Sequence, residues 1–389
     1  MEATSAGVSG LAGTRPGLLG LLHERLLAWR DRRIADPRFR AWAARFPLTR
    51  PTARREARAL FDLCAGFVYS QVLLACVQLG LFSRLATGPV AASTLASESR
   101  MSEEGMARLL DAAVSLRLLR RLADGRAAIG PLGAAMVGNP GLAAMVAHHA
   151  LVYRDLADPV ALLRGDNGQA ALAAYWPYAG ASAPVALDHA AIAPYTALMA
   201  STQPLVSAEV LAAYDFSGHR CLLDVGGGNG SFLAAVGARH PDLSLMLFDL
   251  PAVARAGEEQ LAAAGLGERA RCIGGDFLTD ALPRGADVIS LVRVVHDHDE
   301  VRVAAILRAA RAALPIGGTL LIAEPLADTP GAEPIGAAYF GFYLLAMGRG
   351  RARSVSELTH LLAEAGFGSS RLVATHTPLV ASLIAATAT

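Results

Sequence analysis

A glycine-rich turn and two aspartates are the residues in this chain whose types and spacing best suit the binding of a ligand. Asp224 lies near the end of a short apolar run, and the turn GGGNG (226–230) follows it. Glycines in such a turn adopt positive φ and let a ligand approach the backbone closely. Asp249 follows a second apolar run, where an acidic residue can accept hydrogen bonds from two ribose hydroxyls. This spacing predicts a ligand that contains a nucleoside.

The charge of the ligand is indicated by departures from the dinucleotide-binding fingerprint. Ser231 stands where the third glycine of G-x-G-x-x-G would be. The carboxylate of Asp224 is poorly suited to a pyrophosphate seated on a helix N-terminus. It suits a ligand that carries an ammonium and a sulfonium, and S-adenosylmethionine fits that description. A generic nucleotide-binding unit is the alternative.

Two further residues are placed to hold an adenine ring. A short strand at 271–273 leads into Gly274-Gly275-Asp276-Phe277. Asp276 would accept a hydrogen bond from the adenine amino group, and Phe277 would cover the ring. A simple turn is the competing interpretation of these residues.

A histidine beside acidic residues is a candidate proton acceptor. His296 follows the apolar run 287–295, which is expected to be a central strand, and Asp297 comes next. An imidazole titrates near working pH, so it suits removal of a hydroxyl proton as the oxygen attacks a sulfonium methyl. Glu324, just past the next expected strand, is placed to orient the ring and stabilise its cation. A surface histidine at a helix start and a metal site that includes His298 are the alternatives.

Alternating strands and helices must position these side chains. Apolar runs at 221–225, 244–248, 271–273, 287–295 and 319–323 are separated by segments that include expected helices at 231–239 and 301–314. This order predicts a parallel sheet with helices on both faces, whose ligand site lies at the carboxyl ends of the strands. We expect this α/β domain to cover residues 215–389.

The preceding segment, 59–214, has a mainly helical pattern. Helices at 61–86, 92–96 and 103–119 and a hairpin over 118–129 with an Asp-Gly turn predict a winged helix. A winged helix can bind DNA, but Glu103 and Glu104 at the start of the helix expected at 103–119 oppose phosphate contacts. A role in a subunit interface is therefore favoured. Further helices are expected at 145–163 and 188–214.

The first 58 residues are basic, with twelve arginines against five acids. Residues 1–18 are expected to be disordered. Residues 19–58 are expected to form a helical arm whose aromatic side chains pack on the body of the protein, with contact to anionic lipid as the alternative. The uncharged run 63–83 is long enough to span a bilayer, yet its polar residues and Gly80 favour a buried interface helix.

Composition narrows the class of protein further. The 389 residues carry a net charge of +1, which indicates no nucleic-acid partner. Four cysteines without CxxC spacing indicate neither a disulfide framework nor a zinc site. The first residues lack the basic start and apolar core of a signal peptide. A cytoplasmic protein is expected, with peripheral contact to an inner or photosynthetic membrane left open.

Five motifs resemble the small-molecule O-methyltransferases that include plant caffeate and acetylserotonin enzymes: DVGGGNG, FDLP, GGDF, RVVHD and LIAEP. The resemblance covers nearly the whole chain. It implies a homodimer, with a winged-helix dimerisation domain and a class I methyltransferase domain, Rossmann-like with a mostly parallel seven-stranded sheet. It implies His296 as the proton acceptor, with Glu324 and Asp297 beside it. No metal is expected, because His296 and His298 alternate with the acids and need not converge. The cofactor-binding residues expected for S-adenosylmethionine are Asp224, Gly226, Gly228, Gly230, Asp249, Leu250, Asp276, Phe277 and Arg293.

The chain departs from the plant pattern at three positions around the base. His298 replaces a tryptophan, Val292 replaces a lysine with Arg293 beside it, and Ala352 replaces a second flanking glutamate. The plant orientation of the base and the plant phenol pocket are therefore not expected here.

Longer segments are similar to purple-bacterial carotenoid enzymes, the hydroxyneurosporene or demethylspheroidene O-methyltransferases. These segments are ARFPLTRPTARREARALFDL, HHALVYRDLADPVALLRG, AAYWPY and YFGFYLLAMGRGRARS. The likeness implies methylation of the tertiary 1-hydroxyl of an acyclic carotenoid, and the apolar stretch 335–347 agrees with a hydrocarbon acceptor. The expected substrate-lining residues are Met199, Tyr339, Phe342, Tyr343 and Met347.

Three alternatives remain at this point. The first is an O-methyltransferase that acts on a phenol or a polyketide. The second is a winged-helix regulator that senses a ligand, which the acidic start of the helix expected at 103–119 disfavours. The third is an NAD-linked oxidoreductase, which Ser231 and Asp224 disfavour.

Overall fold

The computed structural model describes residues 18–166, 168, 170–176 and 189–389. Contacts divide the chain into two units, 1–72 and 73–389. The disorder expected at the N-terminus falls on residues 1–17, outside the described residues. The boundaries expected near 58 and 214 stay predictions.

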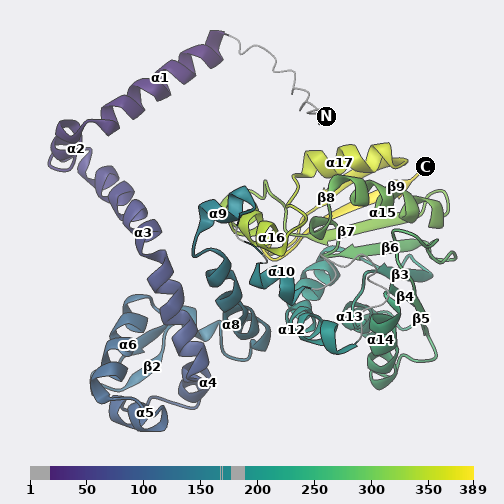
Figure 1. Ribbon diagram of the computed structural model, residues 1–389, viewed down its shortest axis with the longest axis horizontal. Coiled ribbons are helices and arrows are strands. Elements are labelled where there is room, and N and C mark those ends of the chain that lie inside the picture. The colour runs from purple at the N-terminus through teal and green to yellow at the C-terminus, as the bar shows by residue number, and fades with distance from the viewer. Residues whose placement is uncertain (1–17, 167, 169, 177–188) are drawn as a thin grey trace. The chain divides into compact units, whose positions relative to one another are not determined.

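The described part of the first unit is helical, in agreement with the pattern of residues 19–58 (Figure 1). It contains α1 (Leu18–Ala35), α2 (Pro37–Ala43) and the start of α3 (Arg50–Gln78). Pro37 begins α2 at a position where no N–H donor is needed. The Asp36 carboxylate caps the same helix by accepting from the Arg38 N–H, at 2.8 Å.

The apolar run 63–83 falls mostly in α3. Among the described residues, α3 is the one helix long and apolar enough to cross a membrane by length and composition, with a hydropathy of 1.8. Leu63 and Phe67 are exposed within this chain (81% and 64%). Gly80 has a φ of 63° and separates α3 from the next helix, so the helix expected over 61–86 is interrupted there. The burial of this run in a subunit interface stays a prediction.

The second unit begins with the expected winged-helix order. Helices α4 (Leu81–Ala86), α5 (Ala92–Glu98) and α6 (Glu103–Ser115) precede the antiparallel pair β1 (Leu119–Arg121) and β2 (Ala127–Ile129). The expectation that the third helix reaches residue 119 was wrong. Arg117 takes a left-handed φ of 61°, and the Leu118 N–H turns back to the Ala113 carbonyl, so α6 ends first.

Among the described residues of the stretch that follows are the helices α7 (Pro131–Ala134), α8 (Pro140–Asp155), α9 (Pro159–Arg164), α10 (Ala171–Tyr175) and α12 (His189–Ala213). The single helix expected at 145–163 was wrong, because the chain forms α8 and α9 instead. Pro159 cannot donate a backbone hydrogen bond inside a helix, and it starts α9 while Asp158 caps that helix. Helix α12 lies within one residue of its expected limits.

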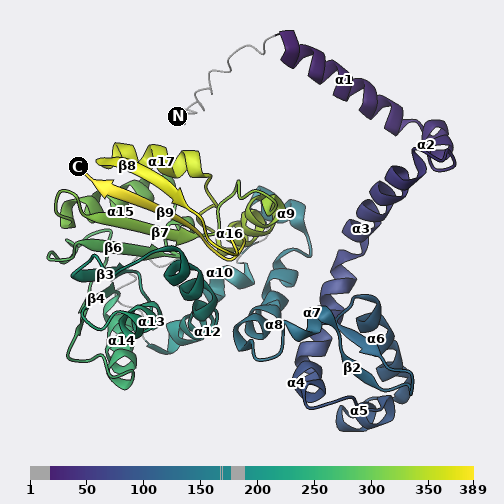
Figure 2. The same ribbon diagram turned by 180° about the vertical axis from the view of Figure 1, so that it is seen from behind.

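The seven-stranded sheet confirms the expected fold class. Its order is β5-β4-β3-β6-β7-β9-β8, and β9 runs opposite to the other strands of this sheet (Figures 1 and 2). The chain runs outward from β3 through β4 to β5 and then resumes on the other side of β3 with β6. That reversal is the point at which such sheets bind ligands. The strands are β3 (Cys221–Val225), β4 (Ser244–Asp249), β5 (Ala270–Gly274), β6 (Val288–Val292), β7 (Thr319–Glu324), β8 (Phe367–Val373) and β9 (Ser382–Ala388).

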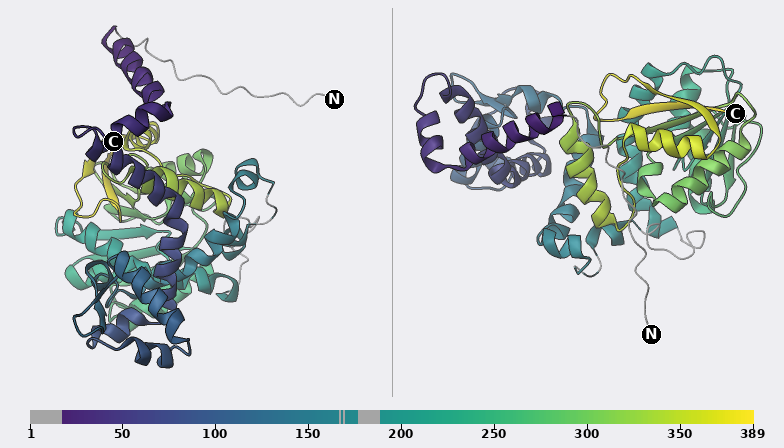
Figure 3. Two further views of the ribbon diagram at one scale, coloured as in Figure 1. Left: turned by 90° about the vertical axis from the view of Figure 1, so that its left-hand side faces the viewer. Right: turned by 90° about the horizontal axis from the view of Figure 1, so that it is seen from above.

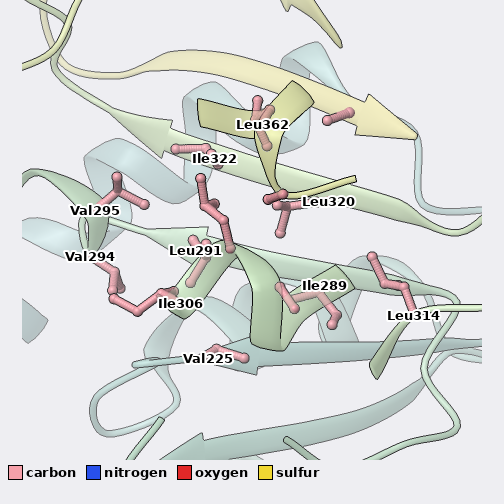
Figure 4. Packing of buried hydrophobic residues seen from close by; sticks show 14 of the residues in the cluster. Val225, Ile289, Leu291, Val294, Val295, Ile306, Leu314, Leu320, Ile322 and Leu362 are labelled. Atoms are coloured by element: carbon pink, nitrogen blue, oxygen red, sulfur yellow. The ribbon is translucent and has the colours of Figure 1, made fainter. Parts of the chain in front are cut away.

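Alternation of side chains along the strands builds a core on each face of the sheet. Leu223, Ile289 and Leu320 pack with α15 (Glu300–Ala313) and α17 (Val355–Glu364), as Figure 4 shows in part. The neighbouring residues Leu222, Val288 and Leu321 belong to the other cluster, with α12 and α13 (Ser231–Arg239). Helix α17 lies beside β8 (Figure 3). The described residues also form α14 (Pro251–Ala263), the 3-10 turn η2 (Val295–Asp297), the π-helix η3 (Pro334–Phe340) and α16 (Gly341–Met347).

The strand expected at 287–295 is shorter than predicted. It ends at Val292, because Arg293 takes a left-handed φ of 57° and η2 follows. His296 therefore lies on a tight turn beyond the strand. Glu324, expected just past β7, is the last residue of that strand.

Candidate active site

A cavity of about 340 Å³ lies at the carboxyl ends of β3, β4, β5 and β6. Eight of the nine expected cofactor residues line it: Asp224, Gly226, Gly228, Asp249, Leu250, Asp276, Phe277 and Arg293. Gly230 is not among the lining residues. It has a φ of 77° at the start of α13, against the Leu261 side chain, so the structure gives it a role in the turn.

The carboxylate of Asp224 is fully buried and lies next to the glycine turn. Its Oδ1 accepts a 2.6 Å hydrogen bond from the Ser290 hydroxyl, and its Oδ2 has no partner among the described residues. Burial raises the pKa of Asp224 to about 7. The hydrogen bond from Ser290 acts in the opposite direction, because it stabilises the charged carboxylate. A Cβ at Gly227 would collide with this carboxylate. Ser290 is a functional residue that no motif or spacing in the sequence indicated.

Asp249 ties the second strand to the glycine turn. Its Oδ2 accepts from the Gly228 N–H at 2.8 Å, and its Oδ1 accepts from the Leu250 N–H at 2.7 Å. Burial raises the pKa of Asp249 to about 6, and the two backbone donors act in the opposite direction. Each oxygen keeps a second lone pair, so the carboxylate can still accept hydroxyl donors from a ligand.

Asp276 and Phe277 form another side of the cavity. The Asp276 Oδ1 accepts from the Leu278 N–H at 2.9 Å. The rings of Phe277 and His298 pack edge to face, with 5.4 Å between their centroids. Burial lowers the pKa of His298 to about 4, so this cavity-lining ring is neutral near pH 7. Contacts of Asp276 and Phe277 with an adenine ring stay a prediction.

His296, Asp297 and Glu324 form a buried cluster at the ends of β6 and β7. The Glu324 Oε2 lies 3.1 Å from the His296 Nδ1 and also accepts from the His296 backbone N–H at 3.1 Å. The other ring nitrogen, Nε2, lies 3.2 Å from the Asp297 Oδ1. A carboxylate on Nδ1 favours the tautomer that keeps its proton there and leaves Nε2 basic. The structure therefore places Glu324 where the sequence suggested an orienting acid.

Charge and burial act in opposite directions on this histidine. Burial alone would lower the pKa of His296, but the carboxylates of Asp297 and Glu324 outweigh it and the pKa is raised. Burial raises the pKa of Asp297 to about 6. Asp297 and His298 line the cavity, whereas the His296 ring, 7% exposed, lies outside the set of lining residues. Asp297 is thus the member of the cluster that meets the cavity.

Arg353 holds the turn that carries the histidine, and the sequence did not single it out. It is fully buried, and its guanidinium donates to the Val295 and His298 carbonyls at 3.0 and 2.8 Å. Gly350 lies so close to the His296 carbonyl that a Cβ would collide with it. Arg353 follows Ala352, the position at which the plant pattern has a glutamate. In this chain, hydrogen bonds from Arg353 to backbone carbonyls support the turn instead.

Arg293 connects the cavity to α12. Its guanidinium donates to the Thr202 Oγ1 at 2.7 Å and to the Met199 carbonyl at 3.2 Å. Met199 is the one expected substrate residue that lines this cavity, together with Trp176 and Tyr195.

The other expected substrate residues lie on η3 and α16, outside the lining. Tyr343 and Met347 are buried, and Tyr339 and Phe342 pack against the same apolar cluster. The Tyr343 hydroxyl lies 2.9 Å from the His148 Nε2, and the Tyr339 hydroxyl lies 2.7 Å from the His149 Nε2. Phe340, which the sequence analysis did not select, meets His296 with 6.0 Å between ring centroids. A substrate contact for these aromatic residues stays a prediction.

Comparison with known proteins places this geometry in a family. The profile of the O-methyltransferase domain matches residues 153–368, and that of the O-methyltransferase dimerisation domain matches residues 61–132. The chain belongs to the O-methyltransferase family. It is similar to the demethylspheroidene O-methyltransferase of Cereibacter sphaeroides, with 45% identity over 90% of this chain and 92% of the relative. The enzyme of the same name from Rhodobacter capsulatus is 39% identical over 98% of this chain and 92% of the relative.

The solved structures confirm the class I methyltransferase fold. That of human N-acetylserotonin methyltransferase in complex with S-adenosylmethionine has a TM-score of 0.68 and 26% identity, and covers 86% of this chain and 97% of the other.

The residues present here fit S-adenosylmethionine on two observations. The unpartnered Asp224 Oδ2 is a buried anionic acceptor at the cavity, which calls for a hydrogen-bond donor. A Cβ at Gly226 would lie 2.9 Å from Val294, which also lines the cavity, so the absence of a side chain keeps this wall open.

Proposed function

We propose that this protein transfers the methyl group of S-adenosylmethionine to the tertiary hydroxyl of an acyclic carotenoid. The observation that carries the proposal is the 45% identity with a demethylspheroidene O-methyltransferase, which extends over 90% of this chain. The methyl donor supplies an electrophilic methyl on a sulfonium. The acceptor supplies a hydroxyl oxygen, and its proton must leave as the new bond forms.

The residues at the ends of β3 and β4, called the cofactor half of the site, bind and orient the methyl donor. Asp249 is held by two backbone N–H groups and presents its free lone pairs to the ribose hydroxyls. Asp224 offers its unpartnered oxygen to a cationic or N–H-bearing group. Leu250 and Phe277 supply apolar walls. Because these groups are fixed by the sheet and the glycine turn, the donor binds without reorganisation of the site.

The cluster of His296, Asp297 and Glu324, called the base half of the site, removes the proton. Glu324 holds the His296 Nδ1–H, so the basic Nε2 faces Asp297. Asp297 meets the cavity and connects it to the imidazole. The two carboxylates stabilise the imidazolium that forms once the proton reaches Nε2. An alkanol is a much weaker acid than a phenol, so a positioned base contributes more with this acceptor.

A homodimer is part of the proposal. The profile match at 61–132 is a dimerisation domain. Exposed apolar side chains along α3, including Phe61 and Phe67, supply a surface for a second copy.

The test is an acceptor panel with labelled S-adenosylmethionine. Hydroxylated acyclic carotenoids, simple phenols and N-acetylserotonin are offered separately to the purified protein, and label in each product is measured. We expect label in the carotenoid ether with a kcat/KM well above that of the phenols. Preferential labelling of a phenol would assign the phenolic alternative, and no labelling of any hydroxyl would remove the proposal.

A further inference from the structure

The arm formed by residues 18–58 precedes both family matches, which begin at residues 61 and 153. The proposed chemistry therefore makes no use of it. The arm holds eleven arginines and four acids. Its side chains are mostly exposed, including large apolar ones. A solvated helical arm would not need that apolar surface.

One face of α1 is an apolar stripe. Leu19, Leu22, Leu26 and Trp29 follow a spacing of three, four and three residues, which places them on one side of a helix. Their exposed fractions are 83%, 55%, 62% and 54%. The stripe therefore presents four large side chains to whatever lies outside this unit.

Charges are arranged around this stripe with a consistent sign. At 3.6 residues per turn, Arg25 and Arg30 project about 60–80° to either side of the middle of the stripe. Glu24 and Asp31 project about 170° away from it, on the opposite face. The cation of Arg33 lies over the Trp29 ring, 5.6 Å from its centroid. Basic residues thus border the apolar face, and the acids of α1 point away from it.

Helix α2 and the residues that follow it repeat the combination of aromatic rings and arginines. Trp42 and Phe46 stack with 5.0 Å between ring centroids, and half of the Trp42 surface is exposed. Arg38, Arg40 and Arg45 lie among these aromatic residues in the sequence. Rings beside guanidinium groups suit the boundary between lipid headgroups and acyl chains.

We infer that residues 18–58 bind the surface of a bilayer that contains anionic lipid. The α1 stripe and Trp42 would enter the acyl boundary, while Arg25, Arg30 and their neighbours contact headgroup phosphates. The four arginines and two acids of α1 exclude a helix that crosses the bilayer. Charge complementarity favours anionic lipid over a second copy of this arm, because two arms with an excess of arginine repel each other. Such binding would bring the enzyme to an acceptor dissolved in a membrane.

The experiment uses the full-length protein and two kinds of vesicle, phosphatidylcholine alone and an equal mixture with phosphatidylglycerol. Co-sedimentation is measured at low and high salt. We expect binding to the mixed vesicles, weakened by salt, and little binding to phosphatidylcholine. Equal binding to both, or none to either, would overturn the inference.

Variants assign the binding to the arm. Arg25→Gln with Arg30→Gln should weaken binding about fivefold for each arginine removed. Leu26→Glu should abolish vesicle binding. The matched control is Ile316→Glu, at an exposed site (84%) in the methyltransferase domain, and it should leave vesicle binding unchanged. S-adenosylhomocysteine binding checks that each variant is folded. If Leu26→Glu instead dissociates the oligomer and leaves vesicle binding intact, the stripe contacts a second copy and the inference is wrong.

Discussion

The two halves of the active site are built in different ways. At the ends of β3 and β4, the cofactor half is made largely of backbone, and Asp249 is held by the N–H groups of Gly228 and Leu250. At the ends of β6 and β7, the base half is made of side chains, with His296 and Glu324 separated by 28 positions in the chain.

This difference predicts which changes each half tolerates. The glycine turn is sensitive to added volume, because a new Cβ at Gly227 would collide with the fully buried side chains of Asp224 and Leu247. A buried ionic cluster is sensitive to charge, because removing one partner leaves another uncompensated. Substitutions of each kind can therefore separate binding of the donor from proton removal.

His296→Ala should have the largest effect and should act on one half alone. General-base assistance is worth about 10²–10⁴-fold, so kcat should fall by that factor. Calorimetry with S-adenosylhomocysteine should give an unchanged Kd, because the ring does not line the cavity. Full turnover in this variant would show that proximity alone drives the reaction.

Gly227→Ala should damage the cofactor half. The new Cβ meets the Asp224 carboxylate and Leu247, so the turn must shift. Overpacking of this kind costs about 1–3 kcal/mol, which corresponds to a Kd for S-adenosylhomocysteine raised about 5–150-fold. Gly218→Ala is the matched control, since nothing lies within 4 Å of a Cβ there. Equal affinities for the two variants would contradict this account of the turn.

Glu324→Gln should change the pH dependence of turnover. The raised pKa of His296 means that activity increases with pH as the ring loses its proton. Glutamine keeps an acceptor for the Nδ1–H but removes a negative charge, so the pKa of His296 falls. The midpoint of the kcat–pH profile should move to lower pH, and kcat at its plateau should fall about tenfold as the base weakens. An unchanged or higher midpoint would remove Glu324 from this role.

Ser290→Ala should give the smallest effect, again on the cofactor half. The Ser290 hydrogen bond lowers the pKa of Asp224, which burial raises to about 7. Without it the pKa rises further, and more of the carboxyl is protonated at pH 7. A hydrogen bond to a charged group is worth about 1.5–3 kcal/mol, and the ligand senses only part of it, so Kd should rise a few-fold. The difference in Kd from wild type should shrink as the pH is raised, because Asp224 then also ionises in the variant; a difference that stays constant with pH would indicate a purely structural effect.

The sequence by itself determined the cofactor half and the sheet that positions it. DVGGGNG and the aspartate after the next strand lie close together in the chain, and local rules for strands, turns and glycines apply to them directly. The limits of β3 and α13 agree with those expected. The same local reasoning failed at 287–295 and 103–119, where Arg293 and Arg117 adopt a left-handed φ that residue type does not predict.

Only the tertiary structure decided how the base half is assembled. The carbonyl contacts of Arg353 and the ring of Phe340 reach this half from separate elements, and no local spacing connects them. The same is true of the Ser290 hydroxyl in the cofactor half. Tyr343 and Met347 were expected to line the substrate site but pack in a buried apolar cluster instead. Sequence alone does not distinguish these two roles for an apolar side chain near a site. Short-range backbone preferences depend on neighbouring residues, whereas contact between side chains that are distant in the sequence depends on how the elements pack.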